Sequence, residues 1–381
     1  MNITIVTGFF LPVPPVRGGA TEKIWYRLAR EFVAAGHRVT FISRSWPDFP
    51  QRETIDGVSH IRVRGVHHTR SLPLNLWHDF WWGVRVSRVL PSADVVICNS
   101  PTLPAWLGFA RPSAERVVAV VARMPKGQGR AYGRVDLILA LSAAVATSLR
   151  AENPQLADRI VPFPFPIDWP LHARAGKRDP ATSPITIGYI GRVHPEKGLR
   201  LLLSAAAQLV SRVDLPPWNL EIIGPVDVPA GGGGQEFYDA LKHDFGKALG
   251  ERLRFSGPEF DAEKLALRYG AIDIFCYPSL ADRGETFGVA VAEAMAAGCA
   301  PVVSNLACFQ ELVHDNDTGL VFDQAASNAG EQLASALARL LSDAQLRCEL
   351  GARAQQHSRR FDFTACAGTV LDDLQRVVVT K

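Results

Sequence analysis

Short apolar runs rich in β-branched residues alternate with longer segments of helical periodicity along nearly the whole chain. The first such group is an apolar run at 2–7, a Pro- and Gly-rich loop, an amphipathic helix at 21–35 that Thr21 would cap, and a second run at 38–43. A strand, a helix and a second strand in this order form a βαβ unit with a right-handed crossover. The pattern therefore predicts an α/β protein built on parallel sheets.

This rhythm occurs in two blocks, which a Pro-rich extended segment at 160–169 and a polar run at 172–183 separate. It restarts with an apolar run at 185–190. A chain of 381 residues with 47% hydrophobic residues is long and apolar enough for two cores. We therefore expect two α/β domains, with the linker and hinge at 160–183.

Composition excludes several classes of protein. The net charge of +3 gives no reason to expect nucleic acid as a partner, and the six Cys and ten His show no zinc-binding spacing. No apolar run reaches the roughly 18 residues that span a bilayer, and Met1 leads straight into a strand, so we expect neither a membrane span nor a signal peptide. Cys276, Cys299 and Cys308 fall in or near apolar runs, so buried thiols in a reducing cytoplasm are their expected state.

The most informative stretch is 277–305, which predicts a strand end, a loop, a helix at about 288–297 and a buried strand. Glu285 lies in the loop, and Glu293 follows eight positions later in the helix. The free N–H groups of the first helical turn suit a phosphate. A carboxylate before that turn suits a neutral, hydroxyl-rich neighbour such as a sugar, and Glu293 could reach a ribose. The stretch thus predicts a site for a nucleotide-sugar diphosphate.

The sequence GETFGVAVAEAMAAGCAPVVS resembles the Glu-x7-Glu donor signature of family 4, a large family of retaining glycosyltransferases with the GT-B fold. The resemblance implies that Glu285 contacts the transferred sugar and that Glu293 contacts the ribose. It also implies that the backbone of Phe287, Gly288 and Val289 lies along the sugar and the phosphates.

A second motif follows the strand at 185–190, where Arg192 and Lys197 flank a loop that ends at Gly198. Two cations beside a strand-to-helix turn suit a diphosphate. The motif resembles the Gly-Arg…Lys-Gly pattern of the same family, which implies that both cations bind the donor diphosphate. Gly224 ends the next strand at the predicted cleft, and the resemblance places 257–260 beside the nucleotide base. His194 and Glu196 are interpreted as plain loop residues.

The N-terminal block offers further site candidates. Gly18 and Gly19 precede the first helix and resemble the Gly-Gly loop of the family, which implies that they bind the donor by approaching its phosphates, close to the acceptor. A turn that needs positive φ would explain them equally well. Strand ends of a parallel sheet point to the binding crevice, which predicts that a further set of residues lines it: Asn99, Ser100, Arg123 and Lys126. Many family members carry a His at one of these strand ends, and this chain has none there.

An aromatic segment at 67–90 carries Trp77, Phe80 and Trp81, with Arg85 and Arg88 beside them. Its functional interpretation is an acceptor platform or a helix on a membrane surface. We favour a core-facing helix, because tryptophans cover a core as readily as a ligand.

Two further motifs are interpreted structurally. The Asp315-x-Asp317 spacing is expected to form a turn rather than a metal site. The Gly run at 229–234 is expected to be a flexible, exposed loop, and 308–313 a helix.

The resemblance covers nearly the whole chain. It implies two Rossmann-like domains facing across a cleft: 1–166 on the acceptor side, 167–360 binding the nucleotide sugar, and a C-terminal helix at 361–381 that crosses back. The implied reaction is retaining transfer from a nucleoside-diphosphate sugar, UDP-sugar being preferred to GDP-sugar, without metal or cofactor. The acceptor is a glycan, a lipid-linked sugar or a small hydroxylated metabolite.

Several points stay open in the sequence. Peripheral contact of this cytoplasmic protein with a membrane is one of them, and the oligomeric state is another. A non-catalytic nucleotide-sugar-binding subunit remains an alternative, as does a GT-B phosphorylase or epimerase.

Overall fold

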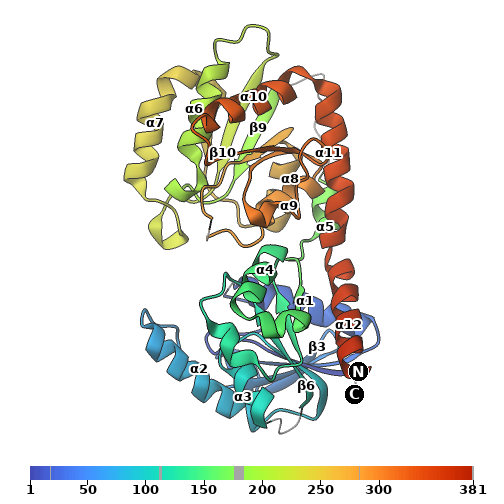
Figure 1. Cartoon of the computed structure of the whole chain (residues 1–381). Helices are drawn as coiled ribbons and strands as arrows, with labels where there is room; N and C mark the ends of the chain where they lie inside the picture. The colour runs from blue at the N-terminus through green and yellow to red at the C-terminus, as the bar shows by residue number, and fades with distance from the viewer. Residues whose placement is uncertain (18, 111–113, 176–183, 283, 380–381) are drawn as a thin grey trace. The chain divides into compact units, whose positions relative to one another are not determined.

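A computed structural model of the chain describes residues 1–17, 19–110, 114–175, 184–282 and 284–379. By its internal contacts the chain divides into two units (Figure 1). Unit 1 consists of Met1–Pro166 together with Phe363–Lys381, and unit 2 consists of Ile167–Asp362. The chain therefore leaves unit 1 at Pro166 and returns to it for its last helix.

Unit 1 is built on an eight-stranded sheet with the strand order β3-β4-β2-β1-β5-β6-β7-β8. All neighbouring strands are parallel except β3, which pairs antiparallel with β4 at the edge. The strands are β1 (Asn2–Val6), β2 (Arg38–Arg44), β3 (Arg52–Ile55), β4 (Val58–Val63), β5 (Ala93–Cys98), β6 (Ala114–Val121), β7 (Leu137–Ala140) and β8 (Ile160–Pro162). The helices are α1 (Ala20–Ala34), α2 (Leu72–Ser87), α3 (Leu103–Ala110), α4 (Ala143–Glu152) and α12 (Phe363–Val379).

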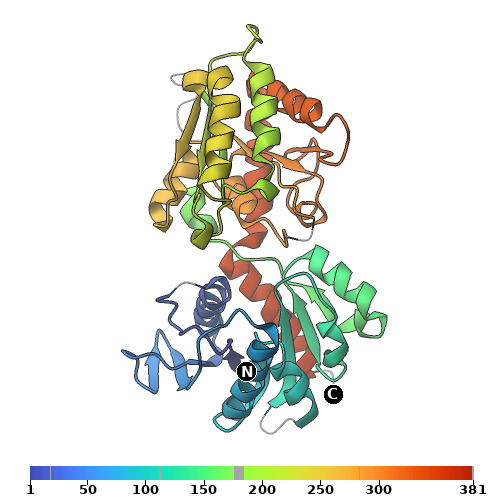
Figure 2. The same cartoon turned by 90° about the vertical axis from the view of Figure 1, so that its left-hand side faces the viewer.

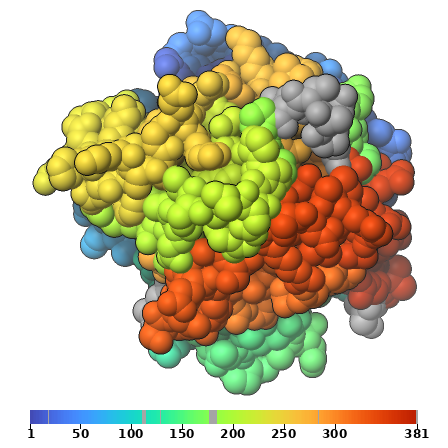
Figure 3. Space-filling model, turned by 90° about the horizontal axis from the view of Figure 1, so that it is seen from above, coloured from blue at the N-terminus to red at the C-terminus, as the bar shows by residue number. Residues whose placement is uncertain are grey.

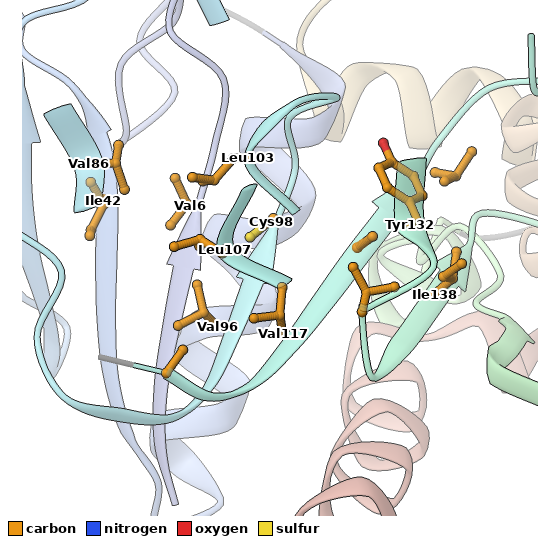
Figure 4. Packing of buried hydrophobic residues seen from close by; sticks show 14 of the residues in the cluster. Val6, Ile42, Val86, Val96, Cys98, Leu103, Leu107, Val117, Tyr132 and Ile138 are labelled. Atoms are coloured by element: carbon orange, nitrogen blue, oxygen red, sulfur yellow. The ribbon is translucent and has the colours of Figure 1, made fainter. Parts of the chain in front are cut away.

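Helices cover both faces of this sheet, which explains why its central strands are apolar on both sides. On one face, side chains of α1 and α12 meet the sheet, among them Leu28 and Leu374. On the other face α2, α3 and α4 do so. Figure 4 shows Val86, Leu103 and Leu107 there, with the strand residues Val6, Val96 and Val117.

Unit 2 is built on a six-stranded sheet, all parallel, with the order β11-β10-β9-β12-β13-β14. Its strands are β9 (Ile185–Ile190), β10 (Trp218–Ile223), β11 (Leu253–Ser256), β12 (Ile274–Tyr277), β13 (Ala300–Ser304) and β14 (Leu320–Phe322). Its helices are α5 (Trp169–Ala173), α6 (Leu199–Leu209), α7 (Gln235–Leu249), α8 (Ala262–Gly270), α9 (Val289–Ala296), α10 (Ala329–Ser342) and α11 (Ala344–Ser358).

The helices of unit 2 also form two layers. α6 packs against both α7 and α10 on one side of the sheet, and α9 packs against α5, α8 and α11 on the other (Figures 1 and 2). In the space-filling view from above, the green segment of α6 lies between the yellow segment of α7 and the orange-red segment of α10 (Figure 3).

In each sheet the chain order reverses at a central strand. β1 pairs with both β2 and β5 in unit 1, and β9 pairs with both β10 and β12 in unit 2. Loops that leave the carboxyl ends of strands on either side of such a switch point diverge and leave a crevice, where α/β proteins bind their ligands. The loops after β1 and β5, and those after β9 and β12, are therefore the places to look for a site.

Three local expectations about helices and linkers were wrong, and a fourth, about the Gly run, was wrong as well. α1 begins at Ala20 with Gly19 at its N-cap position, so Thr21 does not cap it. The expected helix at 308–313 is only a 3₁₀ turn, Ala307–Phe309. The polar run at 172–183 is not all linker, because His172 belongs to α5, which packs on α8 and α9; residues 176–183 lie outside the described residues.

The Gly run at 229–234 is a hydrogen-bonded loop rather than a flexible one. Gly233 N donates to Val193 O at 2.7 Å, and Gly234 N donates to Val226 O at 2.9 Å. A Cβ on Gly232 would lie 2.1 Å from Val226 O, so the absence of side chains is what allows this loop to close on its neighbours.

In the described ranges no helix combines the length and the apolar character that crossing a membrane requires.

Candidate active site

Lys197 and Glu285 meet at the switch point of the unit 2 sheet. Lys197 ends the 3₁₀ turn Pro195–Lys197 after β9, and Glu285 lies in the loop after β12. The Lys197 ammonium donates a hydrogen bond to Glu285 Oε1, and both side chains are buried. Ser279 Oγ and Tyr277 Oη donate to the same carboxylate oxygen at 3.1 and 3.2 Å. The carboxylate is thus held by a cation and two hydroxyl groups.

Gly198 explains how the two loops come so close. It adopts a left-handed conformation with φ of 69°, and a Cβ there would lie 1.9 Å from Pro278 O. Only glycine satisfies both conditions. Beside it, Leu280 N donates to Glu196 O at 2.8 Å, which ties the loop after β12 to the loop after β9.

Arg192 joins this cluster through Glu196. Its guanidinium donates to Glu196 Oε1 at 2.6 Å and to Gly231 O at 2.9 Å. Lys197 Nζ lies 3.5 Å from the same Glu196 oxygen. Burial acts to raise the pKa of Glu196, but the adjacent Lys197 and Arg192 outweigh it and hold that pKa below its usual value. Glu196 therefore pairs with both cations and links them.

Gly224 supports the same loop from below. Its Cβ would lie 1.8 Å from Gly191 O, so the ends of β9 and β10 approach each other as closely as their backbones allow. Gly191 N donates to Ile223 O at 2.9 Å across this contact. Gly224 thus holds the backbone of Gly191, the residue that precedes Arg192.

Glu293 occupies a second pocket on α9. Tyr269 Oη donates to its Oε2 at 2.9 Å, and His172 Nε2 lies 3.7 Å from its Oε1. Its side chain is 21% exposed. Burial raises the pKa of Glu293 to about 7, against the opposing effect of the Tyr269 hydrogen bond. Burial lowers the pKa of His172 to about 4, so His172 is neutral at pH 7.

The start of α9 has the form that the sequence predicted. Gly288 precedes the helix with φ of 98°, and a Cβ there would lie 2.7 Å from the Phe309 ring. Val289 opens the helix, and the N–H groups at the start of a helix have no carbonyl partner one turn earlier. Val291 N in this turn donates to Gly288 O at 2.9 Å. Phe287 is buried with its ring centroid 5.3 Å from that of Phe361. Its side chain therefore anchors the loop and leaves its backbone beside the helix start.

The unit 1 candidates lie on loops after three neighbouring strands, β1, β5 and β6. Gly19 has φ of 91°, and a Cβ there would lie 2.2 Å from Glu22 Oε2. Ser100 Oγ accepts from Leu103 N, the first N–H group of α3, at 3.3 Å, while Asn99 N donates to Val6 O at 2.8 Å. Two further candidates after β6 are exposed: Arg123 and Lys126. Gly18 lies outside the described residues.

Sequence reasoning missed several residues of these pockets. Glu196 and His172 were interpreted as loop and linker residues, and Tyr269 lies on a helix with no motif. Tyr277 and Ser279 had a usable signal, since they stand at the end of a strand beside the switch point.

Asp315 and Asp317 lie in a turn. Asn316 has φ of 59° and its N–H donates to Gly319 O at 2.8 Å, while Asp315 Oδ1 accepts from Val321 N at 2.9 Å. Across the part of the chain that the structure describes, no three His, Cys, Asp or Glu side chains gather as a metal site would require.

The aromatic segment corrects another expectation. Trp77, Phe80 and Trp81 do not face the core, because each is at least 41% exposed, and Trp82 is the aromatic residue of α2 that is buried. Helical periodicity shows which residues share a face of α2, but not which face packs inward.

Two family profiles match nearly the whole chain between them. The profile described as Glycosyl transferases group 1 matches residues 175–357, and the profile described as Glycosyltransferase Family 4 matches residues 18–168. The first covers the pockets of Lys197, Glu285 and Glu293, and the second covers most of unit 1.

Curated relatives include phosphatidyl-myo-inositol mannosyltransferases. The Mycolicibacterium smegmatis protein is 34% identical over 187 residues, which is 49% of this chain and 44% of that protein. The Mycobacterium leprae protein is 27% identical over 293 residues, 76% of this chain and 68% of that protein. A D-inositol 3-phosphate glycosyltransferase of Corynebacterium glutamicum is 33% identical over 187 residues, 48% and 41% of the two chains. The chain thus spans about half the length of two of these relatives.

Solved structures share the fold at low sequence identity. Sucrose-phosphate synthase from Thermosynechococcus elongatus has a TM-score of 0.74 at 22% identity, with 100% of both chains covered. The Anabaena protein HepE in complex with UDP and glucose has a TM-score of 0.69 at 18% identity, with 99% of this chain and 100% of that chain covered. With the two family profiles, these likenesses show that the chain belongs to the family 4 glycosyltransferases and has the GT-B fold.

Proposed function

We propose that the chain transfers a sugar from a nucleoside-diphosphate sugar to a hydroxyl group of an acceptor, with retention of configuration at the anomeric carbon. The observation that carries this proposal is the convergence of Lys197, Arg192 and Glu285 at the switch point of the unit 2 sheet. Two cations suit a diphosphate, and a carboxylate beside them suits the hydroxyl groups of the attached sugar.

In this proposal each charged group has one role. Arg192 and Lys197 bind the diphosphate together with the first-turn N–H groups that follow Gly288. Glu285 accepts hydrogen bonds from the sugar, and Glu293 accepts them from the ribose. Ser279 and Tyr277 keep Glu285 hydrogen-bonded when Lys197 turns to the phosphates.

The reaction breaks the bond between the anomeric carbon and the diphosphate oxygen, and the electron pair leaves with the diphosphate. Lys197 and Arg192 stabilise the negative charge as it grows there. The acceptor oxygen attacks the same face of the sugar, and its proton passes to the departing phosphate oxygen. The side-chain cations supply the countercharge, so the proposal includes no metal ion and no cofactor.

Support for particular substrates comes only from the names and bound ligands of similar proteins. HepE was solved with UDP and glucose, which makes UDP the first nucleotide to test and GDP the second. The curated relatives are named for phosphatidyl-myo-inositol and inositol 3-phosphate. A lipid-linked or small polyol acceptor is therefore preferred to a glycan.

The test is a thermal-shift panel of UDP, GDP and their sugars, followed by NMR of the products formed with and without an acceptor. We expect one nucleoside diphosphate to stabilise the wild-type chain and Lys197→Ala to abolish that stabilisation. Lys247→Ala, on the exposed side of α7, is the matched control and should change nothing.

Three outcomes would contradict the proposal. Stabilisation that survives Lys197→Ala would mean that the site is elsewhere. Sugar phosphate or an isomerised donor as the product would indicate a phosphorylase or an epimerase. Tight donor binding without release of nucleoside diphosphate, whatever the acceptor, would indicate a non-catalytic subunit.

A further inference from the structure

Helix α2 turns its largest apolar side chains to the solvent. The outward face of α2 consists of six residues that are each at least 40% exposed: Leu72, Leu74, Leu76, Trp77, Phe80 and Trp81. Soluble proteins rarely expose a contiguous patch of such residues unless it binds something.

The rings of this face form one cluster. The Trp77 and Trp81 centroids lie 5.7 Å apart and those of Phe80 and Trp81 lie 5.8 Å apart, both in edge-to-face geometry. Positions three and four apart lie on one side of a helix, so Leu76, Trp77, Phe80 and Trp81 present a single apolar surface.

The inward face of α2 carries buried polar side chains, and specific hydrogen bonds hold them in place. Asp79 is buried, and its Oδ2 accepts from Thr102 N at 2.9 Å and from Thr102 Oγ1 at 2.5 Å. Asn75 Oδ1 accepts from Thr69 N at 2.9 Å, and Trp82 Nε1 donates to Thr7 O at 3.0 Å. Rotating the helix to hide its aromatic rings would break these bonds and expose Trp82. The outward orientation is therefore built into the fold.

The segment that carries the outward face has exposed charge of one sign. Residues 64–90 are all described, and Asp79, which points inward, is their only acidic residue. Arg64, Arg70 and Arg88 are exposed, and Arg85 is half-buried with its guanidinium bonded to Arg64 O. Apolar and aromatic side chains flanked by arginines fit the interface of an anionic bilayer, where the rings lie at head-group depth and the guanidinium groups reach phosphates.

We propose that the outward face of α2 docks on a membrane that contains anionic lipid. A second copy of the chain fits less well, because two such faces in contact would bring their arginines together.

The docked face also has a place in the reaction, and this part rests on the proposed function. Asp79 and Trp82 bond to Thr102 and Thr7, which follow β5 and β1 at the carboxyl edge of the unit 1 sheet. A membrane on α2 therefore lies beside the loops of the acceptor candidates, and the acceptor class is a lipid-linked hydroxyl compound.

The test is flotation of the full chain with vesicles of phosphatidylcholine alone or with about 30 mol% phosphatidylglycerol, at roughly 0.1 and 0.5 M salt. We expect binding to the anionic vesicles that falls with salt. Trp77→Ser/Trp81→Ser should lower the partition coefficient by about tenfold or more, since it removes two interfacial anchors. Arg70→Glu/Arg88→Glu should remove the preference for anionic lipid. Val213→Ser, which changes an apolar residue of unit 2 that is 99% exposed, is the matched control and should bind as the wild type does.

Either of two results would overturn the proposal: no binding of the wild-type chain to anionic vesicles, or unchanged binding of Trp77→Ser/Trp81→Ser. A solution dimer that this variant dissociates, without vesicle binding, would assign the face to a second copy instead. Circular dichroism checks that the variant folds, and Leu72→Ser/Leu76→Ser provides an independent second pair.

Nucleoside-diphosphate binding is measured without vesicles and should be equal in wild type and in Trp77→Ser/Trp81→Ser. Vesicle binding without any nucleotide binding would leave the docking surface standing and refute the transferase. The reverse result would refute only the docking surface.

Discussion

Lys197 and Glu285 are 88 positions apart in the sequence, and their side chains form a buried ion pair at the switch point of the unit 2 sheet. In this arrangement the cation that would hold the diphosphate and the carboxylate that would hold the sugar neutralise each other. Binding of a donor would exchange both partners, because the phosphates take Lys197 and the sugar hydroxyl groups take Glu285. The pocket thus keeps its charges compensated with and without substrate.

The first prediction concerns turnover. Lys197→Ala and Glu285→Ala should each lower kcat on the order of 10²-fold or more, the loss seen when one charge-stabilising group is removed from a transition state. The measurement is release of nucleoside diphosphate with saturating donor and acceptor. Near-normal turnover in either variant would mean that the reacting groups are elsewhere, and Lys247→Ala serves as the control.

A second prediction separates the structural role of the ion pair from its catalytic role. Lys197→Met leaves the buried Glu285 carboxylate without its cation and should lower the free energy of unfolding by about 3 kcal/mol. Lys197→Met/Glu285→Gln removes both charges and should regain most of that stability in chemical denaturation, while remaining inactive. If the double variant is no more stable than Lys197→Met, the two charges are not coupled as described.

A third prediction concerns pH. The pKa of Glu293 lies at about 7 in the folded chain against an ordinary 4.5, so the folded chain binds this proton more tightly than the unfolded chain does. Its contribution therefore favours folding below pH 4.5 and is lost as the pH rises through about 7. Glu293→Gln should flatten the stability profile in that window, as thermal unfolding at a series of pH values would show.

The same group links donor binding to pH. Ribose hydroxyl groups donate to a carboxylate, so donor affinity should rise from about pH 6 to about pH 8 as Glu293 loses its proton. Tyr269→Phe removes a hydrogen bond that favours the carboxylate and should move this rise to higher pH. His172 stays neutral throughout, because its pKa is about 4. A donor affinity that is flat over this range would show that Glu293 does not hold the ribose.

A fourth prediction compares two glycines. Gly198→Ala forces a side chain into a left-handed conformation and against Pro278 O, and should cost more than about 2 kcal/mol of stability while displacing Lys197. Gly246→Ala in α7, where a Cβ would meet nothing within 4 Å, should instead stabilise the chain by about 0.5–1 kcal/mol. Equal effects of the two substitutions on denaturation would contradict the close approach at Gly198.

The fold class follows from the sequence because buried parallel strands are near-continuous apolar runs. The runs at 185–190 and 300–303 coincide with β9 and β13 to within one residue. Lys197 could be selected from the sequence because it stands beside Gly198 in a recognisable strand-to-helix turn. The ion pair between Lys197 and Glu285 depends on strand order, which places β9 beside β12 and which no local pattern records.

Other residues could not be found from the sequence because their roles depend on contacts between distant segments of the chain. His172 lies in a polar run, and only the return of α5 onto α8 and α9 brings it to Glu293. The outward face of α2 has the same helical period as a core face. What decides between them is the hydrogen bonding of Asp79 with Thr102, a contact across 23 positions.

The path of the chain through unit 1 has a consequence for biosynthesis. α12 contributes Cys366, Val370 and Leu374 to the core that residues of α1 also form. A ribosome that has made only residues 1–166 has therefore made unit 1 without the helix that completes this core, whereas unit 2 is one contiguous segment, 167–362. The unit begun first is therefore completed last. We expect a fragment cut after Pro166 to aggregate, and a fragment of 167–362 to remain in solution.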